Sequence, residues 1–189
     1  MGRCIERRVL MPDIVDAGRR AGHACWIELR LFKALGSWVA DTARSADPAL
    51  SRMFAEHSHH HAWHADLWRN RIPKLEHHPP TEVTRPPNDA VVELVDMVTS
   101  AAGSVDRLVG VYRVLIPRLI EEYEALLQAT SPLTDGPTAR VLKLCLADLH
   151  NELREGETAL ASVIDVTATV DDRQTTLDAA AAAAHHLIG

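Results

Sequence analysis

The apolar residues of this chain recur with the period of an amphipathic helix over most of its length. Between about 12 and 43, apolar positions such as Ile14, Ala21, Leu31 and Leu35 fall on one side when residues are placed 100° apart. Alternating runs bounded by Asn-Gly or Asp-Gly turns, which are typical of β-strands, are nearly absent. The pattern predicts an all-α protein whose four main helices cover about 12–43, 47–72, 104–129 and 137–164, with a shorter piece at 89–102.

The connections between these helices predict how they are arranged. The loops after the first and third helices are short, whereas the proline-rich segment from Pro73 to Asn88 is long and is predicted to contain no helix. In helical bundles a short loop joins antiparallel neighbours, and a long loop can cross the length of the bundle. We therefore expect two hairpins joined by a long crossover, in one domain that spans residues 1–189. Its core should cover about 12–164, and residues 165–189 form a tail that either folds as a short helix or frays.

Three residues give local signals within this plan. Asp47 stands directly before Pro48, which is the pattern of an N-cap followed by the first residue of a helix. Asn88 can cap the next helical stretch in the same way. Pro117 lies inside the third main helix and is expected to kink it, because proline lacks the N–H group that a helix interior needs.

Composition narrows the functional classes. With 189 residues, 47% apolar and 24% charged, the chain is typical of one soluble globular domain. Its formal net charge of −6 speaks against nucleic acid as a partner, since binding to phosphates requires a basic surface. No run is apolar enough to span a membrane or to act as a signal peptide, so we expect a cytoplasmic protein with no membrane partner. Cys25 and Cys145 lie within helical patterns and are predicted to be small buried hydrophobes.

The first two helices carry ionisable groups on the sides that should be buried. Glu28 lies near the middle of the apolar face of the first helix, where a carboxyl group should have a raised pKa unless a cation, a metal or a donor compensates. On the second helix the inward histidines are His57, His61 and His64, with His60 at the edge and His59 pointing roughly the other way. Burying so many polar groups costs free energy unless each has a partner. Either they bind something, or they form a hydrogen-bonded layer of the core.

The third and fourth helices offer further candidates. Tyr123 belongs to the apolar stripe of the third helix, and Glu122 lies at the edge of that stripe. A surface pair of Glu122 with Arg118, four residues earlier, is the structural alternative. Asp148 and Glu152 lie four residues apart along one edge of the fourth helix, which is either part of a site or an ordinary solvated edge.

Together these positions resemble the ferritin-like superfamily of di-iron carboxylate proteins. The resemblance rests on Glu28, on the spacing Glu56-x-x-His59, on Glu122 and on the carboxylates of the fourth helix. In that superfamily each hairpin supplies one glutamate from its first helix and Glu-x-x-His from its second, and together these side chains hold two metal ions. It therefore implies a four-helix bundle. The metal ligands that it implies, with His60 as the neighbouring alternative on the second helix, are Glu28, Glu56, His59, His60, Glu122, Asp148 and Glu152.

The fourth helix departs from the pattern of the superfamily. Its nearest equivalents are Asp148-x-x-Asn151 and Glu152-x-x-Glu155, and neither contains the histidine. The ligand set is therefore incomplete, and the site is expected to hold two metal ions, one or none.

Three functions follow from these possibilities. With iron or manganese bound, the resemblance implies an oxidase or oxygenase that transforms a small molecule in specialised metabolism. Without metal, Glu28 with His60, His61 and Tyr123 would form an acid–base site in natural-product biosynthesis. The third function is that of a non-catalytic partner subunit in a helical complex.

A homodimer or heterodimer is expected in addition. Three apolar residues, Trp26, Leu29 and Val109, fall on helix sides predicted to be exposed, where they could cover one another across an interface.

Overall fold

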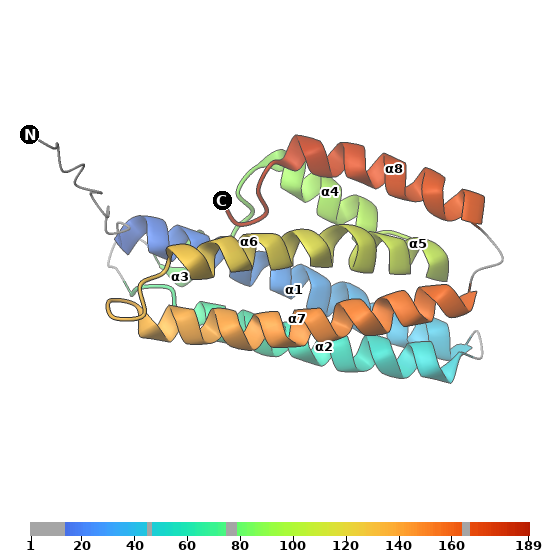
Figure 1. Ribbon diagram of the computed structural model, residues 1–189, viewed down its shortest axis with the longest axis horizontal. Coiled ribbons are helices and arrows are strands. Elements are labelled where there is room, and N and C mark those ends of the chain that lie inside the picture. The colour runs from blue at the N-terminus through green and yellow to red at the C-terminus, as the bar shows by residue number, and fades with distance from the viewer. Residues whose placement is uncertain (1–13, 45–46, 75–78, 164–166) are drawn as a thin grey trace, which may run out of the picture.

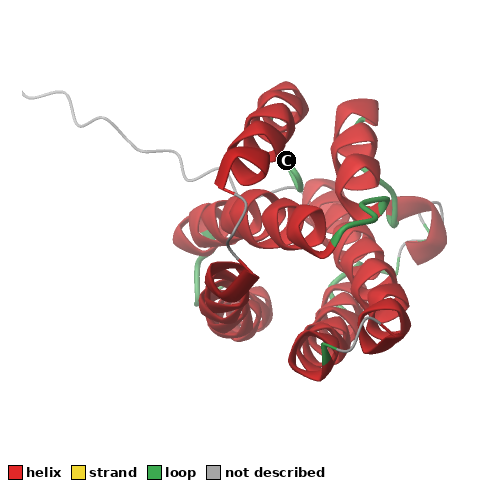
Figure 2. Ribbon diagram, turned by 90° about the vertical axis from the view of Figure 1, so that its right-hand side faces the viewer, coloured by secondary structure: helices red, strands yellow, loops and turns green. Residues whose placement is uncertain are grey.

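Helices α1 (Ile14–Arg44) and α2 (Pro48–Arg69) form an antiparallel hairpin along one side of the molecule (Figure 1). The computed structural model describes residues 14–44, 47–74, 79–163 and 167–189, and within these ranges every regular element is helical (Figure 2). The prediction of an all-α protein is confirmed. Asp47 caps α2 as predicted, because its side chain accepts a hydrogen bond of 2.9 Å from the backbone N–H of Leu50.

The second pair of long elements packs beside the first. Helix α7 (Gly136–Val163) lies against α2, and α6 (Ile116–Ala129) lies against α7. Their contact faces are apolar: Leu142 and Leu149 of α7 and Leu119 of α6 are fully buried. Burial of these stripes at helical spacing holds the pairs together. The ionisable residues of α2 and α7 consequently face each other inside the molecule.

The third main helix is divided into three parts. Helix α5 (Ser104–Leu108) is followed by the π-helical segment η1 (Val109–Leu115) and then by α6. The irregularity expected at Pro117 lies just before it, because Pro117 cannot donate a backbone hydrogen bond and the N–H of Ile116 reaches back five residues to the carbonyl of Val111. Val109 is fully buried, so the prediction that it is exposed at an interface is wrong, whereas Trp26 and Leu29 are partly exposed.

The connection between α2 and the third main helix contains two helices. Its proline-rich part holds α3 (Pro80–Val83), so the prediction that this segment contains no helix is wrong. Proline is compatible with a first helical turn, where its missing N–H is not needed. Helix α4 (Asp89–Thr99) follows, capped as predicted by the side chain of Asn88, which accepts from Val91 N at 3.0 Å.

The C-terminal part of the chain is a packed helix rather than a frayed tail. Helix α8 (Thr167–Ala184) lies on α4 and η1, and α8 and α4 are seen together at the top of Figure 1. Leu177, Leu187 and Ile188 are buried there, so the core extends beyond the predicted limit near residue 164. No helix among the described residues combines the length and the apolar character needed to cross a bilayer.

Candidate functional site

A layer of carboxylate and imidazole side chains crosses the interior between α1, α2 and α7. We call it the Glu/His layer and define it as Glu28, His57, His60, His61, His64, Asp148, Glu152 and Glu155. Five of its members, Glu28, His57, His61, His64 and Glu152, are completely buried. Ionised groups are expensive in such surroundings unless they are paired. The geometry shows that these groups are partners of one another.

Glu28 is the innermost carboxylate of the layer. Its Oε1 accepts a hydrogen bond of 2.7 Å from the hydroxyl of Tyr123 on α6. Its Oε2 lies 2.5 Å from His61 Nδ1 and 3.4 Å from His64 Nδ1. One carboxylate on α1 is thereby held by α2 on one side and by α6 on the other.

Glu152 of α7 forms the second centre of the layer. Its Oε1 accepts from His60 Nδ1 at 3.0 Å, and its Oε2 lies 3.2 Å from His61 Nε2. The ring of His61 therefore lies between the two buried carboxylates, with one nitrogen toward each. Asp148, one turn earlier on α7, accepts from His64 Nε2 at 3.1 Å.

Three buried atoms of this layer have no hydrogen bond. They are His61 Nε2, His64 Nδ1 and Glu152 Oε2. Each lies within 3.4 Å of an atom of a partner group, yet the directions do not suit a hydrogen bond. Buried polar atoms without partners are rare in native proteins and call for a physical explanation. A cation between an imidazole nitrogen and a carboxylate oxygen would supply the missing partner to both.

The charged groups of the layer shift the pKa values of one another. Burial by itself would raise the pKa of Glu28, but the charges of His64 and His61, and their hydrogen bonds, lower it to about 2. The two imidazoles are thus the compensating groups that the sequence analysis allowed for, and the pKa of Glu28 is not raised. Burial by itself would lower the pKa of His61, but Glu152 and Glu28 raise it to about 10. Glu28 is therefore ionised and His61 protonated at neutral pH.

His57 forms a branch of the layer that leads to the surface. Its Nδ1 lies 2.7 Å from the hydroxyl of Tyr112, and its Nε2 lies 3.1 Å from Glu155 Oε2. Tyr112 is fully buried in η1 and its ring fills the space beside Gly156, where an added Cβ would come within 2.1 Å of the ring. Sequence reasoning missed this role of Tyr112, although a buried tyrosine hydroxyl normally finds a partner.

The layer reaches solvent between α2 and α7. The exposed side-chain fractions are 25% for His60, 29% for Asp148 and 43% for Glu155, whereas Glu28 and His61 have none. Polarity thus runs without a break from the centre of the molecule to this edge. Protons can be exchanged with solvent at this edge.

Three predicted ligands lie outside the layer. Glu56 and His59 are exposed on the outer side of α2, so the Glu56-x-x-His59 pair does not join the site. Glu122 accepts hydrogen bonds from the backbone N–H groups of Leu187 at 2.5 Å and Ile188 at 2.9 Å. It therefore holds the segment that follows α8 and is not part of the Glu/His layer.

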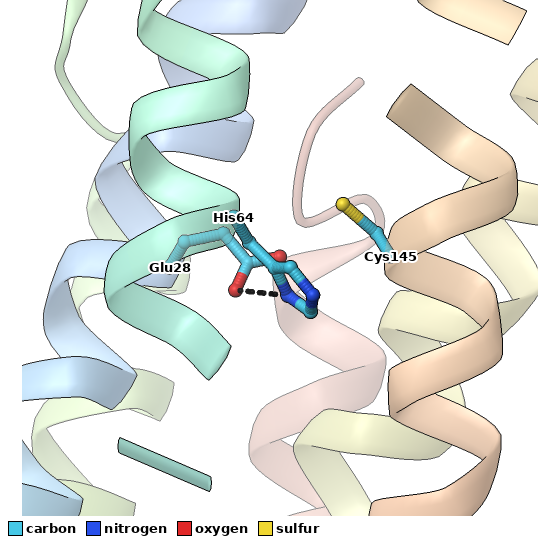
Figure 3. Close-up of side chains that lie close together, drawn as sticks. All are labelled: Glu28, His64 and Cys145. Atoms are coloured by element: carbon cyan, nitrogen blue, oxygen red, sulfur yellow. Dashed lines mark ion pairs between the residues drawn. The ribbon is translucent and has the colours of Figure 1, made fainter. Parts of the chain in front are cut away.

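Cys145 was not among the predicted site residues, yet it lies at the inner end of the layer. One potential ligand atom each of Glu28, His64 and Cys145 lie within 4.8 Å of one another. Figure 3 shows Glu28 and His64 side by side, with Cys145 on the helix that faces them. The signal in the sequence was its position three residues before Asp148, on the buried face of the same helix.

Comparison with protein-family models, with curated proteins and with solved structures finds no match to this chain. The residues of the Glu/His layer are therefore the basis for inferring a function.

Proposed function

We propose that this protein is a ferritin-like metalloprotein that binds divalent metal ions, iron or manganese, in the Glu/His layer and uses them to oxidise a small molecule. The observation that carries the proposal is the set of three buried atoms without hydrogen bonds, His61 Nε2, His64 Nδ1 and Glu152 Oε2. They come from facing helices, and each lies within 3.4 Å of the other member of an imidazole–carboxylate pair.

The hydrogen bonds of His64 indicate which atom would hold a metal. When Nε2–H donates to Asp148, a neutral His64 ring carries a lone pair on Nδ1, and this atom faces Glu28 Oε2 at 3.4 Å. Two electron-rich atoms so placed repel each other unless a positive charge lies between them. In the metal-free protein a proton on the ring supplies that charge, in keeping with the raised pKa of His64, and a metal ion would take the place of this proton. Metal-binding histidines typically donate their other ring N–H to a carboxylate, which is the part that Asp148 plays.

His61 repeats the arrangement toward the second carboxylate. When Nδ1–H donates to Glu28, a neutral His61 ring presents the lone pair of Nε2 to Glu152 Oε2 at 3.2 Å. The other oxygen of Glu152 accepts from His60, which orients the carboxylate. The layer therefore offers two neighbouring positions for a cation, one between His64 and Glu28 and one between His61 and Glu152.

The donor atoms favour iron or manganese. Imidazole nitrogen and carboxylate oxygen are the ligand set of many Fe(II) and Mn(II) sites, and these ions supply one-electron chemistry with dioxygen and small organic substrates. The chain's own part is to hold the ligands and limit access. Tyr123 fixes Glu28, while His60 and Glu155 lie where protons can pass between the layer and solvent.

The fold supports the ferritin-like part of the proposal. The hairpin of α1 and α2 packs beside the pair of α6 and α7, and the segment with α3 and α4 connects them, as a long crossover does in ferritin-like bundles. Among the buried histidines of α2, the i,i+3 pair is His61-x-x-His64, where the superfamily has Glu-x-x-His.

A substrate would approach at the edge between α2 and α7. A cavity of about 330 Å³ lies elsewhere, beside the start of α1, and is lined by Gly18, Ile72 and Arg85 among others. Gly18 and Glu28 are ten residues apart on α1, which is roughly 15 Å along a helix. The exposed side chains of His60 and Asp148 make the α2–α7 edge the nearer approach to the layer.

Metal binding by the purified chain tests the proposal. We expect metal-free protein to take up Fe(II) or Mn(II) under anaerobic conditions. Elemental analysis measures the amount bound, and calorimetry measures the affinity. A free ion concentration of 100 times the Kd should add about 2.7 kcal/mol to the free energy of unfolding. Uptake below about 0.1 equivalent for both ions would overturn the proposal, since ligands arranged in advance should bind tightly.

Matched variants locate the ions. His64→Ala and Glu28→Gln should lower the affinity at least 10-fold. His59→Ala and Glu56→Gln, which alter exposed residues of α2, should leave it unchanged. Equal effects from both sets would show that binding is not in the layer. If His64→Ala and Glu28→Gln lowered stability while the wild type took up no metal, the layer would be purely structural.

A further inference from the structure

Cys145 lies at the inner end of the Glu/His layer, on the buried face of α7. Its side chain is fully buried, and one ligand atom each of Cys145, Glu28 and His64 lie within 4.8 Å of one another (Figure 3). Three elements, α1, α2 and α7, thus bring one sulfur, one oxygen and one nitrogen donor toward a common point.

We infer that Cys145 is a thiolate ligand of the metal ion held by Glu28 and His64, so that this position is a mixed sulfur, nitrogen and oxygen site. This inference rests on the proposed function, because it assumes that the layer binds metal. It goes further by naming a ligand that the ferritin-like resemblance does not provide and by changing the class of metal that the position prefers.

The buried Nδ1 of His64, which makes no hydrogen bond, is the independent observation that points to a ligand at this place. It lies 3.4 Å from Glu28 Oε2 without a hydrogen bond, while the opposite nitrogen of the ring donates to Asp148. Metal–ligand distances of about 2.0 Å to nitrogen and about 2.3 Å to sulfur separate neighbouring ligand atoms in a tetrahedral site by roughly 3.3–3.8 Å. Ligand atoms that already lie within 4.8 Å of one another need only small side-chain movements to reach that geometry.

The spacing of Cys145 and Asp148 on α7 explains how both residues lie near His64. Cys145 and Asp148 are three residues apart, so both side chains lie on the side of α7 that faces α2. Asp148 accepts the proton of His64 Nε2, and Cys145 offers its sulfur within 4.8 Å of one ring nitrogen of His64 and one oxygen of Glu28. In the metal-bound protein the thiol proton leaves to solvent, the thiolate binds the ion, and no electron transfer is required.

A thiolate changes the metal preference of this position. Sulfur donors favour Zn(II), Fe(II) and Co(II) over the harder Mn(II) and Mg(II). The neighbouring position between His61 and Glu152 has nitrogen and oxygen donors. The two positions therefore differ, and the one with Cys145 should select zinc or ferrous iron.

The chain supplies its own control in Cys25. Cys25 is also fully buried, but its Sγ lies 3.4 Å from the carbonyl of Ala65, to which it donates. Both cysteines are small buried residues, so replacing either one by serine makes a similar change in the core. Only Cys145 is expected to contribute sulfur to a bound ion.

Cobalt spectroscopy tests the inference. Metal-free protein is titrated with Co(II) under anaerobic conditions, using a reductant that contains no thiol. We expect visible d–d bands from bound Co(II) together with a near-ultraviolet sulfur-to-cobalt charge-transfer band. Cys145→Ser and Cys145→Ala should keep the d–d bands, in shifted form, and lose the charge-transfer band, while Cys25→Ser keeps both.

The affinities provide a second readout. Zn(II) should bind Cys145→Ala at least 10-fold more weakly than the wild type, whereas the change for Mn(II) should be smaller. Retention of the charge-transfer band in both Cys145 variants would overturn the inference, as would its loss in Cys25→Ser alone. Absence of every cobalt band in the wild type would overturn the proposed function itself, so the two failures can be told apart. Circular dichroism on each variant establishes that it is folded.

Discussion

The two sides of α2 carry the same kinds of residue and use them in opposite ways. On the inner side, His57, His61 and His64 are completely buried and face carboxylates from α1 and α7. On the outer side, Glu56 and His59 are exposed. The outer pair has the spacing familiar from di-iron proteins, yet the inner residues form the layer. A spacing motif therefore matters only when its direction agrees with the buried face of the helix.

The largest expected effect that tests this comparison is the removal of an inner histidine. His61→Ala in the metal-free protein should lower the free energy of unfolding by about 3–5 kcal/mol, because it leaves Glu28 and Glu152 buried without the imidazole between them. His59→Ala should change it by at most about 0.5 kcal/mol. Urea unfolding of both variants provides the measurement. Similar losses for the two would remove the distinction between the sides of α2.

The same contrast shows how much of the molecule could be predicted. The helical period of the apolar residues predicted the long helices. The same period placed Glu28 and His61 on buried sides and His59 on an exposed side, as the structure does. The choice of Glu56 and His59 as ligands followed the spacing of the superfamily rather than the helical period. Both residues are exposed and lie outside the Glu/His layer. For the site, direction on the helix was the better guide.

The remaining differences have physical causes that periodicity does not reveal. The π-helical segment η1 brings Tyr112 beside Gly156, and such a contact between residues 44 positions apart leaves no periodic signal in the sequence. Helix α8 is rich in alanine, so its contact face stands out little from its other sides, although Leu177 and Ala181 are buried. Cys145 looked like an ordinary core residue because only the position of Glu28 and His64 gives it another meaning.

The second effect is a dependence of stability on pH in the metal-free protein. Because the folded-state pKa of His61 is raised from 6.5 to about 10, its stabilisation is complete below pH 6.5 and is lost as the pH rises toward 10. For Glu28 the pKa falls from 4.5 to about 2, so its stabilisation is present above pH 4.5 and is lost as the pH falls toward 2. Stability should therefore be highest between about pH 4.5 and 6.5.

Unfolding midpoints measured from pH 3 to 10 would check this expectation. Binding of Zn(II) should remove the decline above pH 6.5, because a metal ion takes the place of the protons and prefers the neutral imidazole. His59→Ala should follow the wild-type curve at every pH, since the exposed imidazole lies outside the layer. A curve that stays level from pH 6.5 to 10 in the metal-free protein would contradict the coupling of His61 to the two carboxylates.

The two tyrosines that bond to the Glu/His layer should differ in how much they stabilise the fold, which is a smaller effect. Tyr123 donates to the carboxylate of Glu28 at 2.7 Å, and Tyr112 lies 2.7 Å from the imidazole of His57. Hydrogen bonds to charged groups contribute about 1.5–3 kcal/mol and those between neutral groups about 1 kcal/mol. Tyr123→Phe should consequently cost more stability than Tyr112→Phe. Chemical unfolding of the two variants measures the difference, and the reverse order would mean that Glu28 is not the charged centre of the layer.

The smallest effect concerns Glu122, the residue that the superfamily pattern would place on a metal. Glu122→Gln weakens the two hydrogen bonds from the N–H groups of Leu187 and Ile188 and should cost about 1 kcal/mol. The loss should be confined to the C-terminal end, where hydrogen exchange of those two amides should become faster. Metal uptake should remain that of the wild type, whereas Glu28→Gln abolishes or weakens it. If Glu122→Gln lost metal as Glu28→Gln does, Glu122 would belong to the site after all, and the outward spacing on α2 would have to be reconsidered with it.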